Sequence, residues 1–257
     1  MKLLAFCEAP ADFRMASGLV DRVLRDVGPP WVAESLDTPD AVRTWHPDGN
    51  GQIFFDVHRL NEYADRLGVR TTRGHFNGQP GRPGAAMARK AFRVAWKLHR
   101  KTPDEPINLV ILVWDADTQA DGRNEGINDA RIEAKRWAPF DIVCGLPDPE
   151  SEAWILAGFT PASDDEHTAL ADLHQELGFS PVREAARLRD KTSGAPRDIK
   201  RVLGILTSHD VERQARCWSE PLLDTLRQHG QDTGLTVFLD DLAAALRPLL
   251  GVPANGH

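Results

Sequence analysis

The sequence contains no long apolar run and few cysteines. No stretch approaches the roughly 18 consecutive apolar residues of a membrane-spanning helix, and the short apolar start at residues 1–6 reaches Glu8 too soon for a signal peptide. Cys7, Cys144 and Cys217 lie far apart without metal-ligand spacing. This spacing argues against a zinc site and predicts free thiols in a reducing compartment. We therefore expect a cytoplasmic protein with no membrane partner.

Two segments each lack charges of one sign. Residues 66–102 contain ten Lys or Arg and no Asp or Glu, whereas residues 137–182 contain nine Asp or Glu and no Lys or Arg. The net charge of −7 argues mildly against nucleic-acid binding. A basic segment within an acidic protein is nevertheless typical of a local phosphate-binding surface. The alternative is a solvated helix face.

The most informative motif is an apolar run that ends in two carboxylates. Residues 109–114 are all apolar and rich in Val, Ile and Leu, which predicts a buried strand of an α/β sheet. Asp115 and Asp117 follow on the same side of the chain at the strand's end, where such sheets bind ligands. Their mutual repulsion is relieved by a divalent cation such as Mg²⁺. Alternatively, both residues cap the next helix or solvate a loop.

A second acidic position follows the first apolar run. Residues 2–7 predict a strand, and Glu8 comes directly after it, with Asp12 four residues later. Pro10 and the apolar spacing that follows predict a helix from about residue 10. Glu8 therefore stands at a strand-to-helix turn, as Asp115 does.

A third acidic position follows a predicted strand at residues 140–145. Asp148 as the helix N-cap and Pro149 at the first helical position predict a helix start. Glu150 and Glu152 then lie in the first turn. The alternative is that acids there only complement the helix dipole.

The basic segment contains a loop and a helix. Residues 74–84 are rich in Gly and Pro and predict a mobile loop without the Gly-Lys-Ser/Thr ending of a Walker loop. Residues 85–100 predict an amphipathic helix with its basic residues facing outward. We expect the following residues to contact a nucleic-acid backbone: Arg73, His75, Arg82, Arg89, Lys90, Arg93 and Lys97.

Beyond Gly158 the apolar spacing becomes helical throughout. Helices are predicted at residues 164–177, 182–188, 196–206, 210–228 and 235–250. The predicted fold class is α/β, with a mainly parallel sheet flanked by helices and a C-terminal helical lobe. The predicted domains are residues 1–159, and a lobe at residues 160–257 packed on them.

Three acidic sites at successive strand ends resemble the pattern of the Toprim domain. This metal-binding fold occurs in topoisomerases, primases and the overcoming-lysogenization-defect nucleases, which carry a Glu after the first strand and Asp-x-Asp after a later one. Glu8 and Asp115-Ala116-Asp117 match those motifs. Residues 149–156 resemble small stand-alone Toprim-like proteins, many of which appear beside ATPases in bacterial mobile or defence loci. The chain departs from the pattern at Ala9-Pro10, where the family usually has Gly.

The resemblance implies a metal-dependent phosphodiesterase, and specifically a nuclease acting on DNA or RNA. Asp115, Asp117, Glu150 and Glu152 would bind one or two Mg²⁺ or Mn²⁺ ions, and Glu8 would be a ligand or the general base beside Asp12. Lys191 or Lys200 would stabilise charge developing on the phosphate.

Three other classes of protein remain open. A non-catalytic partner of an ATPase encoded nearby is the main alternative. A topoisomerase or primase is disfavoured, because Tyr63 is the only tyrosine and there is no zinc-binding cysteine set. A phosphatase with an Asp nucleophile is disfavoured because the Asp-x-Asp motif comes late in the chain.

Overall fold

The computed structural model describes residues 1–70, 75–76, 78–116 and 120–253. The chain divides into two compact units. The sheet unit comprises Met1–Gly145 and Asp240–His257, and the helical unit comprises Leu146–Leu239. The sequence places a boundary near residue 159, whereas the division falls after Gly145 and again inside the last helix, α11 (Leu235–Leu249).

The sheet unit is built on a five-stranded parallel sheet in the order β2-β1-β6-β7, with β3 also paired to β1. The strands are β1 (Lys2–Cys7), β2 (Thr44–Trp45), β3 (Phe55–Asp56), β6 (Ile107–Val113) and β7 (Asp141–Gly145). Leu3–Cys7 are completely buried. The structure thus confirms the predicted α/β fold with a parallel sheet, and continuous apolar strands are expected where helices cover both faces.

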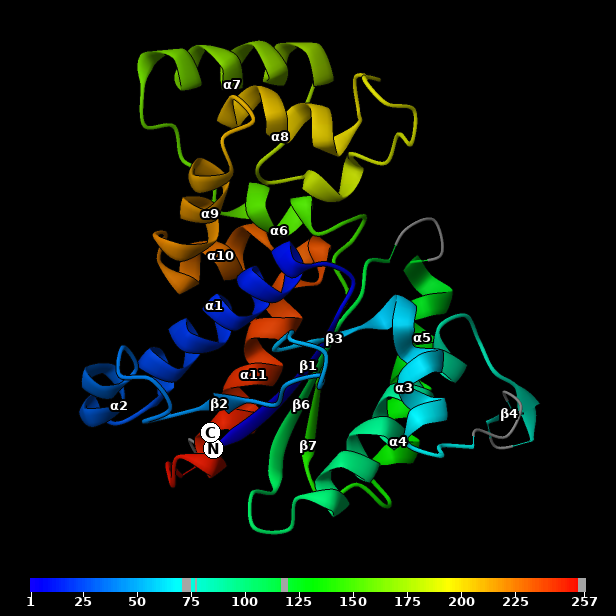
Figure 1. The fold of residues 1–257 in the computed structure, drawn as a ribbon. Coiled ribbons are helices and arrows are strands. Elements are labelled where there is room, and N and C mark those ends of the chain that lie inside the picture. The colour runs from blue at the N-terminus through cyan, green and yellow to red at the C-terminus, as the bar shows by residue number, and fades with distance from the viewer. Residues whose placement is uncertain (71–74, 77, 117–119, 254–257) are drawn as a thin grey trace. The chain divides into compact units, whose positions relative to one another are not determined.

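Helices flank this sheet on both sides. Figure 1 shows α1 on one side and α4 and α5 on the other. Their bounds and those of the shorter elements are α1 (Pro10–Val27), α2 (Pro30–Ser35), η1 (Val57–Arg59), α3 (Leu60–Arg66), α4 (Ala85–Lys101) and α5 (Ala120–Ala134). Helix α1 begins with Pro10 at its first position, and the Asp12 carboxylate accepts a hydrogen bond from the Ala9 N–H at 3.0 Å. The Ala9-Pro10 sequence therefore forms the N-terminus of α1, stabilised by the Asp12 side chain.

The Gly- and Pro-rich segment before α4 contains a short hairpin. Strands β4 (His75–Phe76) and β5 (Gln79–Pro80) pair antiparallel. Arg89 on α4 stabilises it, because its guanidinium donates to the His75 carbonyl at 2.8 Å and lies 3.5 Å from the centre of the Phe76 ring. The described part of the segment predicted as a mobile loop thus contains a short hairpin that Arg89 contacts.

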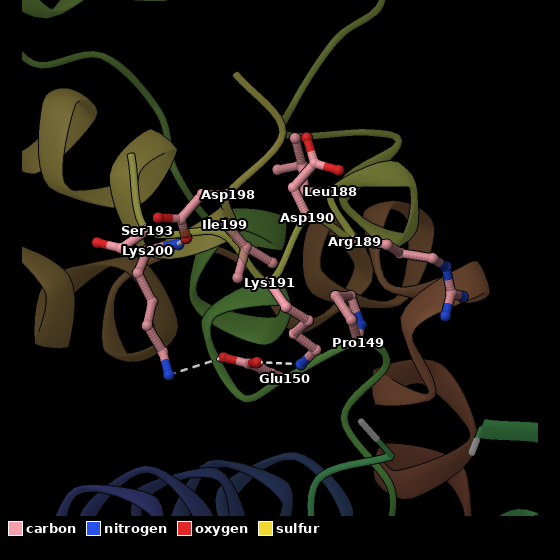
Figure 2. A pocket seen from close by; sticks show the side chains of 10 residues that line it. All are labelled: Pro149, Glu150, Leu188, Arg189, Asp190, Lys191, Ser193, Asp198, Ile199 and Lys200. Carbon is pink, nitrogen blue, oxygen red and sulfur yellow. Dashed lines mark hydrogen bonds and ion pairs between the residues drawn. The ribbon is translucent and has the colours of Figure 1, made fainter. Parts of the chain in front are cut away.

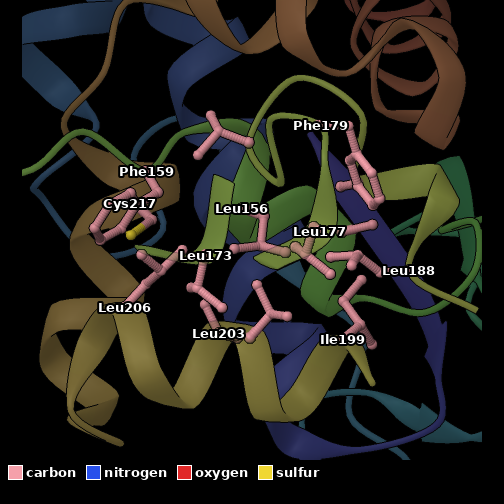
Figure 3. Packing of buried hydrophobic residues seen from close by; sticks show 14 residues of the cluster. Leu156, Phe159, Leu173, Leu177, Phe179, Leu188, Ile199, Leu203, Leu206 and Cys217 are labelled. Atoms are coloured by element: carbon pink, nitrogen blue, oxygen red, sulfur yellow. The ribbon is translucent and has the colours of Figure 1, made fainter. Parts of the chain in front are cut away.

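The helical unit has its own apolar core. Its elements are α6 (Glu152–Ala157), α7 (Asp164–Leu177), η3 (Ala185–Arg187), α8 (Ile199–Thr207), α9 (Val211–Ser219), α10 (Leu223–His229) and η4 (Gln231–Thr233). In Figure 3, Leu156 of α6, Leu173 of α7 and Leu203 of α8 point toward one another. Burial of these side chains joins three helices that are individually too short to be stable in water.

Three helix predictions in this unit were wrong. Residues 182–188 contain only the short 3₁₀ helix η3. Helix α6 begins at Glu152, with Ser151 as its N-cap, because the Asp148 carboxylate binds Arg189 at 2.9 Å instead of capping a helix. Residues 210–228 form two helices, α9 and α10. Pro221 lies between them and cannot continue a helix, because it lacks an N–H donor.

No helix within the described ranges is both long and apolar enough to span a bilayer.

Candidate functional site

Glu8 and Asp115 lie together at the carboxyl ends of two neighbouring strands. Strands β1 and β6 are adjacent and parallel, with Phe6 opposite Leu112, so the residues that follow each strand emerge at the same edge. The Asp115 N–H donates a hydrogen bond to the Glu8 Oε2 atom at 3.2 Å. This edge is where open α/β sheets place their ligands.

Strand β3 brings His58 to the same edge. Cys7 pairs with Asp56 in the register of β1 and β3, and the Asp56 carboxylate accepts a hydrogen bond from the His58 N–H at 2.8 Å. The His58 Nε2 atom then lies 3.6 Å from the Glu8 Oε1 atom. The His58 side chain is 67% exposed and that of Glu8 only 20%, so the imidazole is the more accessible member of this pair.

His58 was not predicted as a site residue. The only signal for it in the sequence is the largely apolar run at residues 53–57, which resembles a short strand. A strand placed next to β1 would have put both Asp56 and His58 at the edge that carries Glu8. The pairing partner of such a short strand is not encoded in its own sequence.

Two neighbouring groups fix the backbone around Glu8 and Asp115. The buried Asp12 carboxylate closes the turn after Glu8. Arg123 donates a hydrogen bond to the Asp115 carbonyl oxygen, and its guanidinium lies 4.6 Å from the centre of the Trp114 ring. Burial raises the pKa of Cys7 well above its ordinary value, and the charges of Asp12 and Glu8 raise it further. Cys7 is therefore a protonated thiol beneath this edge.

The edge supplies the oxygen ligands that a hard divalent cation prefers. Glu8 and Asp115 both stand at this edge, where the Asp115 backbone N–H donates a hydrogen bond to the Glu8 carboxylate. Asp117, the second acid of the motif, lies outside the described residues. Across the described ranges, no group of three or more His, Cys, Asp or Glu residues is arranged to hold a metal ion.

Glu150 belongs to a separate charged cluster in the helical unit. Its carboxylate lies between two lysines (Figure 2), with Lys191 hydrogen-bonded to Oε1 and the Lys200 Nζ atom 2.8 Å from Oε2. The Glu150 side chain is 13% exposed. Burial alone would raise the pKa of Glu150, but hydrogen bonds from Lys191 and Lys200 outweigh it and lower that pKa. Glu150 is therefore a carboxylate held by two cations.

These residues line a pocket of about 150 Å³. Asp198 caps α8 by accepting hydrogen bonds from the Lys200 N–H at 3.0 Å and the Gly194 N–H at 2.8 Å, which fixes the segment that carries Lys200. Arg189 lines the pocket and binds Asp148. The Asp148 Oδ1 atom is buried without a hydrogen-bond partner in the described part of the chain.

The structure leaves part of the predicted acidic site untested. Glu152 is the first residue of α6, as the prediction of a first-turn position requires, whereas Glu150 precedes that helix. Both residues belong to the helical unit. The convergence of Glu150 and Glu152 on Glu8 and Asp115 thus stays a prediction. In the structure, Lys191 and Lys200 bind the Glu150 carboxylate.

Arg89 does not face outward, so the prediction that it is exposed was wrong. It is buried on α4 with only 7% of its surface exposed. Its Nε atom donates to the Glu133 carboxylate of α5 at 2.9 Å. The reason is that α5 packs against this face of α4, and Glu133 and Phe76 enclose the guanidinium.

The other predicted nucleic-acid contacts are more accessible. Lys90 and Lys97 are partly exposed, and His75 and Arg82 are exposed. Lys90 hydrogen-bonds the Asn61 side chain, and Arg82 forms an ion pair with Glu125 at 2.8 Å. Arg93, with 38% of its side chain exposed, is 3.9 Å from Glu133. Arg73 lies outside the described residues.

No protein-family model, curated protein or solved structure matches this chain.

Proposed function

We propose that the chain is a metal-dependent phosphodiesterase, most specifically a nuclease that acts on DNA or RNA. The observation that carries this proposal is the hydrogen bond between Asp115 and Glu8 at the carboxyl ends of β6 and β1. This bond brings together two residues that the resemblance to the Toprim domain assigns to one metal site. A nuclease also accounts for a basic segment in a protein of net charge −7.

In this proposal Glu8, Asp115 and Asp117 provide carboxylate oxygens for Mg²⁺ or Mn²⁺. A bound divalent ion would neutralise phosphate charge and orient a water molecule for in-line attack. The protein holds these ligands on the rigid ends of two buried strands, which favours a precise geometry. The exposed His58 imidazole lies 3.6 Å from Glu8 and would be accessible to a substrate phosphate at this edge.

The second charged cluster has a supporting role in the proposal. Lys191 and Lys200 carry the positive charge that would stabilise a phosphate, with Glu150 and Glu152 as further candidate ligands. Because both lysines bind Glu150, the three side chains act as one unit. Substitution of Glu150 would remove the carboxylate that both lysines bind.

A cleavage assay tests the proposal. The protein is incubated with plasmid, single-stranded DNA and RNA, each with Mg²⁺, Mn²⁺ or EDTA. We expect metal-dependent cleavage, and a loss of about a hundredfold or more in Asp115→Asn and Glu8→Gln, as for other groups that act directly in catalysis. Asp104→Asn is the matched control, because Asp104 is exposed in the loop before β6, away from its carboxyl end.

Full activity in Asp115→Asn would overturn the assignment of this edge. Absence of both cleavage and metal binding would instead favour the non-catalytic alternative, a partner subunit of an ATPase.

A further inference from the structure

Two tryptophans and three cations form a surface at the other end of the sheet unit. We name Trp96, Trp137, Arg93, Lys97 and Arg100 the aromatic–basic surface. Trp96 lies on α4, and Trp137 follows α5, where its N–H bonds the Ala134 carbonyl at 3.0 Å. The two rings meet edge to face, with centroids 6.4 Å apart. Both tryptophans are partly exposed.

Cations lie against both rings. The Arg93 guanidinium is 4.2 Å from the centre of the Trp137 ring. The Arg100 guanidinium and the Lys97 Nζ atom are 5.0 Å and 5.7 Å from the centre of the Trp96 ring. Lys135 and Arg136, which precede Trp137, are also exposed. This arrangement presents positive charge and aromatic surface together.

Trp137 lowers the stability of the fold relative to a phenylalanine at the same position. Its Nε1 atom is buried and has no hydrogen-bond partner among the residues that the structure describes. An unpaired buried donor destabilises a fold, and phenylalanine would provide similar packing without that donor. Nor is the Arg93–Trp137 contact needed to join the helices, because the buried Arg89–Glu133 pair already links α4 to α5. These observations favour a binding role for the indole.

We propose that the aromatic–basic surface binds single-stranded nucleic acid by base stacking. Bases stack on indole rings and guanidinium planes, while cations follow the phosphates. Only unpaired bases expose their faces, so duplex nucleic acid cannot use the rings in this way. An acidic peptide would use the cations but not the rings. The inference rests on the proposed function for its biological meaning, since it names the substrate class of the nuclease.

The position of this surface sets a length for the bound strand. The His99 Nδ1 atom lies 3.2 Å from the Ile107 carbonyl oxygen, so the end of α4 is beside the start of β6. The surface therefore lies near the amino ends of β6 and β7, and Asp115 follows the opposite end of β6. At about 3.3 Å per residue, the seven-residue strand β6 places the aromatic–basic surface roughly 20 Å from Asp115. A single-stranded nucleic acid that reaches both places must span that distance.

The test measures binding of a labelled dodecathymidylate by fluorescence anisotropy in EDTA, where no metal-dependent cleavage occurs. We expect Trp96→Leu and Trp137→Leu each to weaken binding about tenfold, with Trp96→Phe close to wild type because it retains a stacking ring. Trp31→Leu is the matched control, because Trp31 is 50% exposed on α2 and lies outside this surface. Circular dichroism checks that each variant is folded.

A second variant avoids the tryptophan packing altogether. Arg100 is exposed, and Arg100→Gln is expected to weaken binding and to reduce its dependence on salt. Wild-type affinity in both leucine variants would overturn the inference. So would duplex DNA or polyglutamate that displaced the labelled dodecathymidylate as well as the unlabelled oligonucleotide does. Because binding is measured without metal, these outcomes are distinct from the failure of cleavage, which would overturn only the proposed catalytic function.

Discussion

The Asp115 N–H bonds the Glu8 carboxylate across 107 positions of sequence. Neither residue is unusual alone, since acids are common after strands and before helices. Their significance comes from the parallel pairing of β1 and β6, which brings both to one edge. The sequence predicted each residue's place at a strand end, and the register of the sheet determines that they are neighbours.

Arg89 shows where prediction from local sequence fails. A basic residue on an amphipathic helix is normally exposed, but the partner that permits its burial, Glu133, lies 44 residues later. The same applies to Asp148, whose carboxylate binds Arg189, 41 residues away. Helix patterns describe short-range periodicity only, so they cannot identify a charge that is neutralised by a distant element.

The Arg89–Glu133 pair makes a prediction about stability. Arg89→Met leaves the Glu133 carboxylate, 26% exposed, without its buried partner and removes the guanidinium from the Phe76 ring. We expect the free energy of unfolding in urea to fall by about 2–4 kcal/mol. The double variant Arg89→Met/Glu133→Leu should recover part of this loss, because no unpaired charge remains.

The matched control for this stability prediction is Arg25→Met, which breaks the exposed Arg25–Asp37 pair. Exposed pairs contribute little because water screens them. If Arg89→Met were as stable as Arg25→Met, the buried pair would not stabilise the fold.

At the scale of elements, long apolar or strongly periodic segments were predictable. Strands β1, β6 and β7 follow from apolar runs, and α7 has the bounds predicted for it. Strands β2 and β3 contain two residues each and exist only through pairing with β1. That dependence explains why His58 was missed, since its place at the edge is set by the β3 pairing.

The junction between α7 and α9 predicts a response to pH. Arg213 binds the Glu166 carboxylate through two hydrogen bonds, at 2.7 Å and 2.9 Å. The bonds from Arg213 lower the pKa of Glu166 below its ordinary value of 4.5, despite the opposing effect of burial. Because the folded-state pKa is below the unfolded one, the stabilisation is complete above about pH 4.5 and is lost as pH falls through the folded value.

We therefore expect Glu166→Gln to reduce the free energy of unfolding by about 2 kcal/mol at pH 7, with a smaller difference from wild type near pH 3. Urea unfolding at both pH values measures this difference. Glu184→Gln is the control, because the Glu184–Arg187 pair is exposed and screened. If Glu166→Gln lowered the free energy of unfolding by the same amount at both pH values, the loss of the charged pair would not be the cause.

At the scale of the whole molecule, each unit has its own charged cluster. The sheet unit holds Glu8 and Asp115 at its carboxyl edge and the aromatic–basic surface near the other end of β6. The helical unit holds Glu150 between Lys191 and Lys200. The net charge of −7 conceals this separation of charges. Total charge therefore says less about partners than the location of each basic or acidic group.

The measurement closest to the central claim is a calorimetric titration of the full chain with Mn²⁺. We expect saturable binding that is at least about tenfold weaker in Asp115→Asn and Glu8→Gln, because each substitution removes a charged oxygen ligand. Asp104→Asn should bind Mn²⁺ as the wild type does. Equal Mn²⁺ affinity in wild type, Asp115→Asn and Glu8→Gln, or no binding by the wild type, would contradict the assignment of this edge as a metal site.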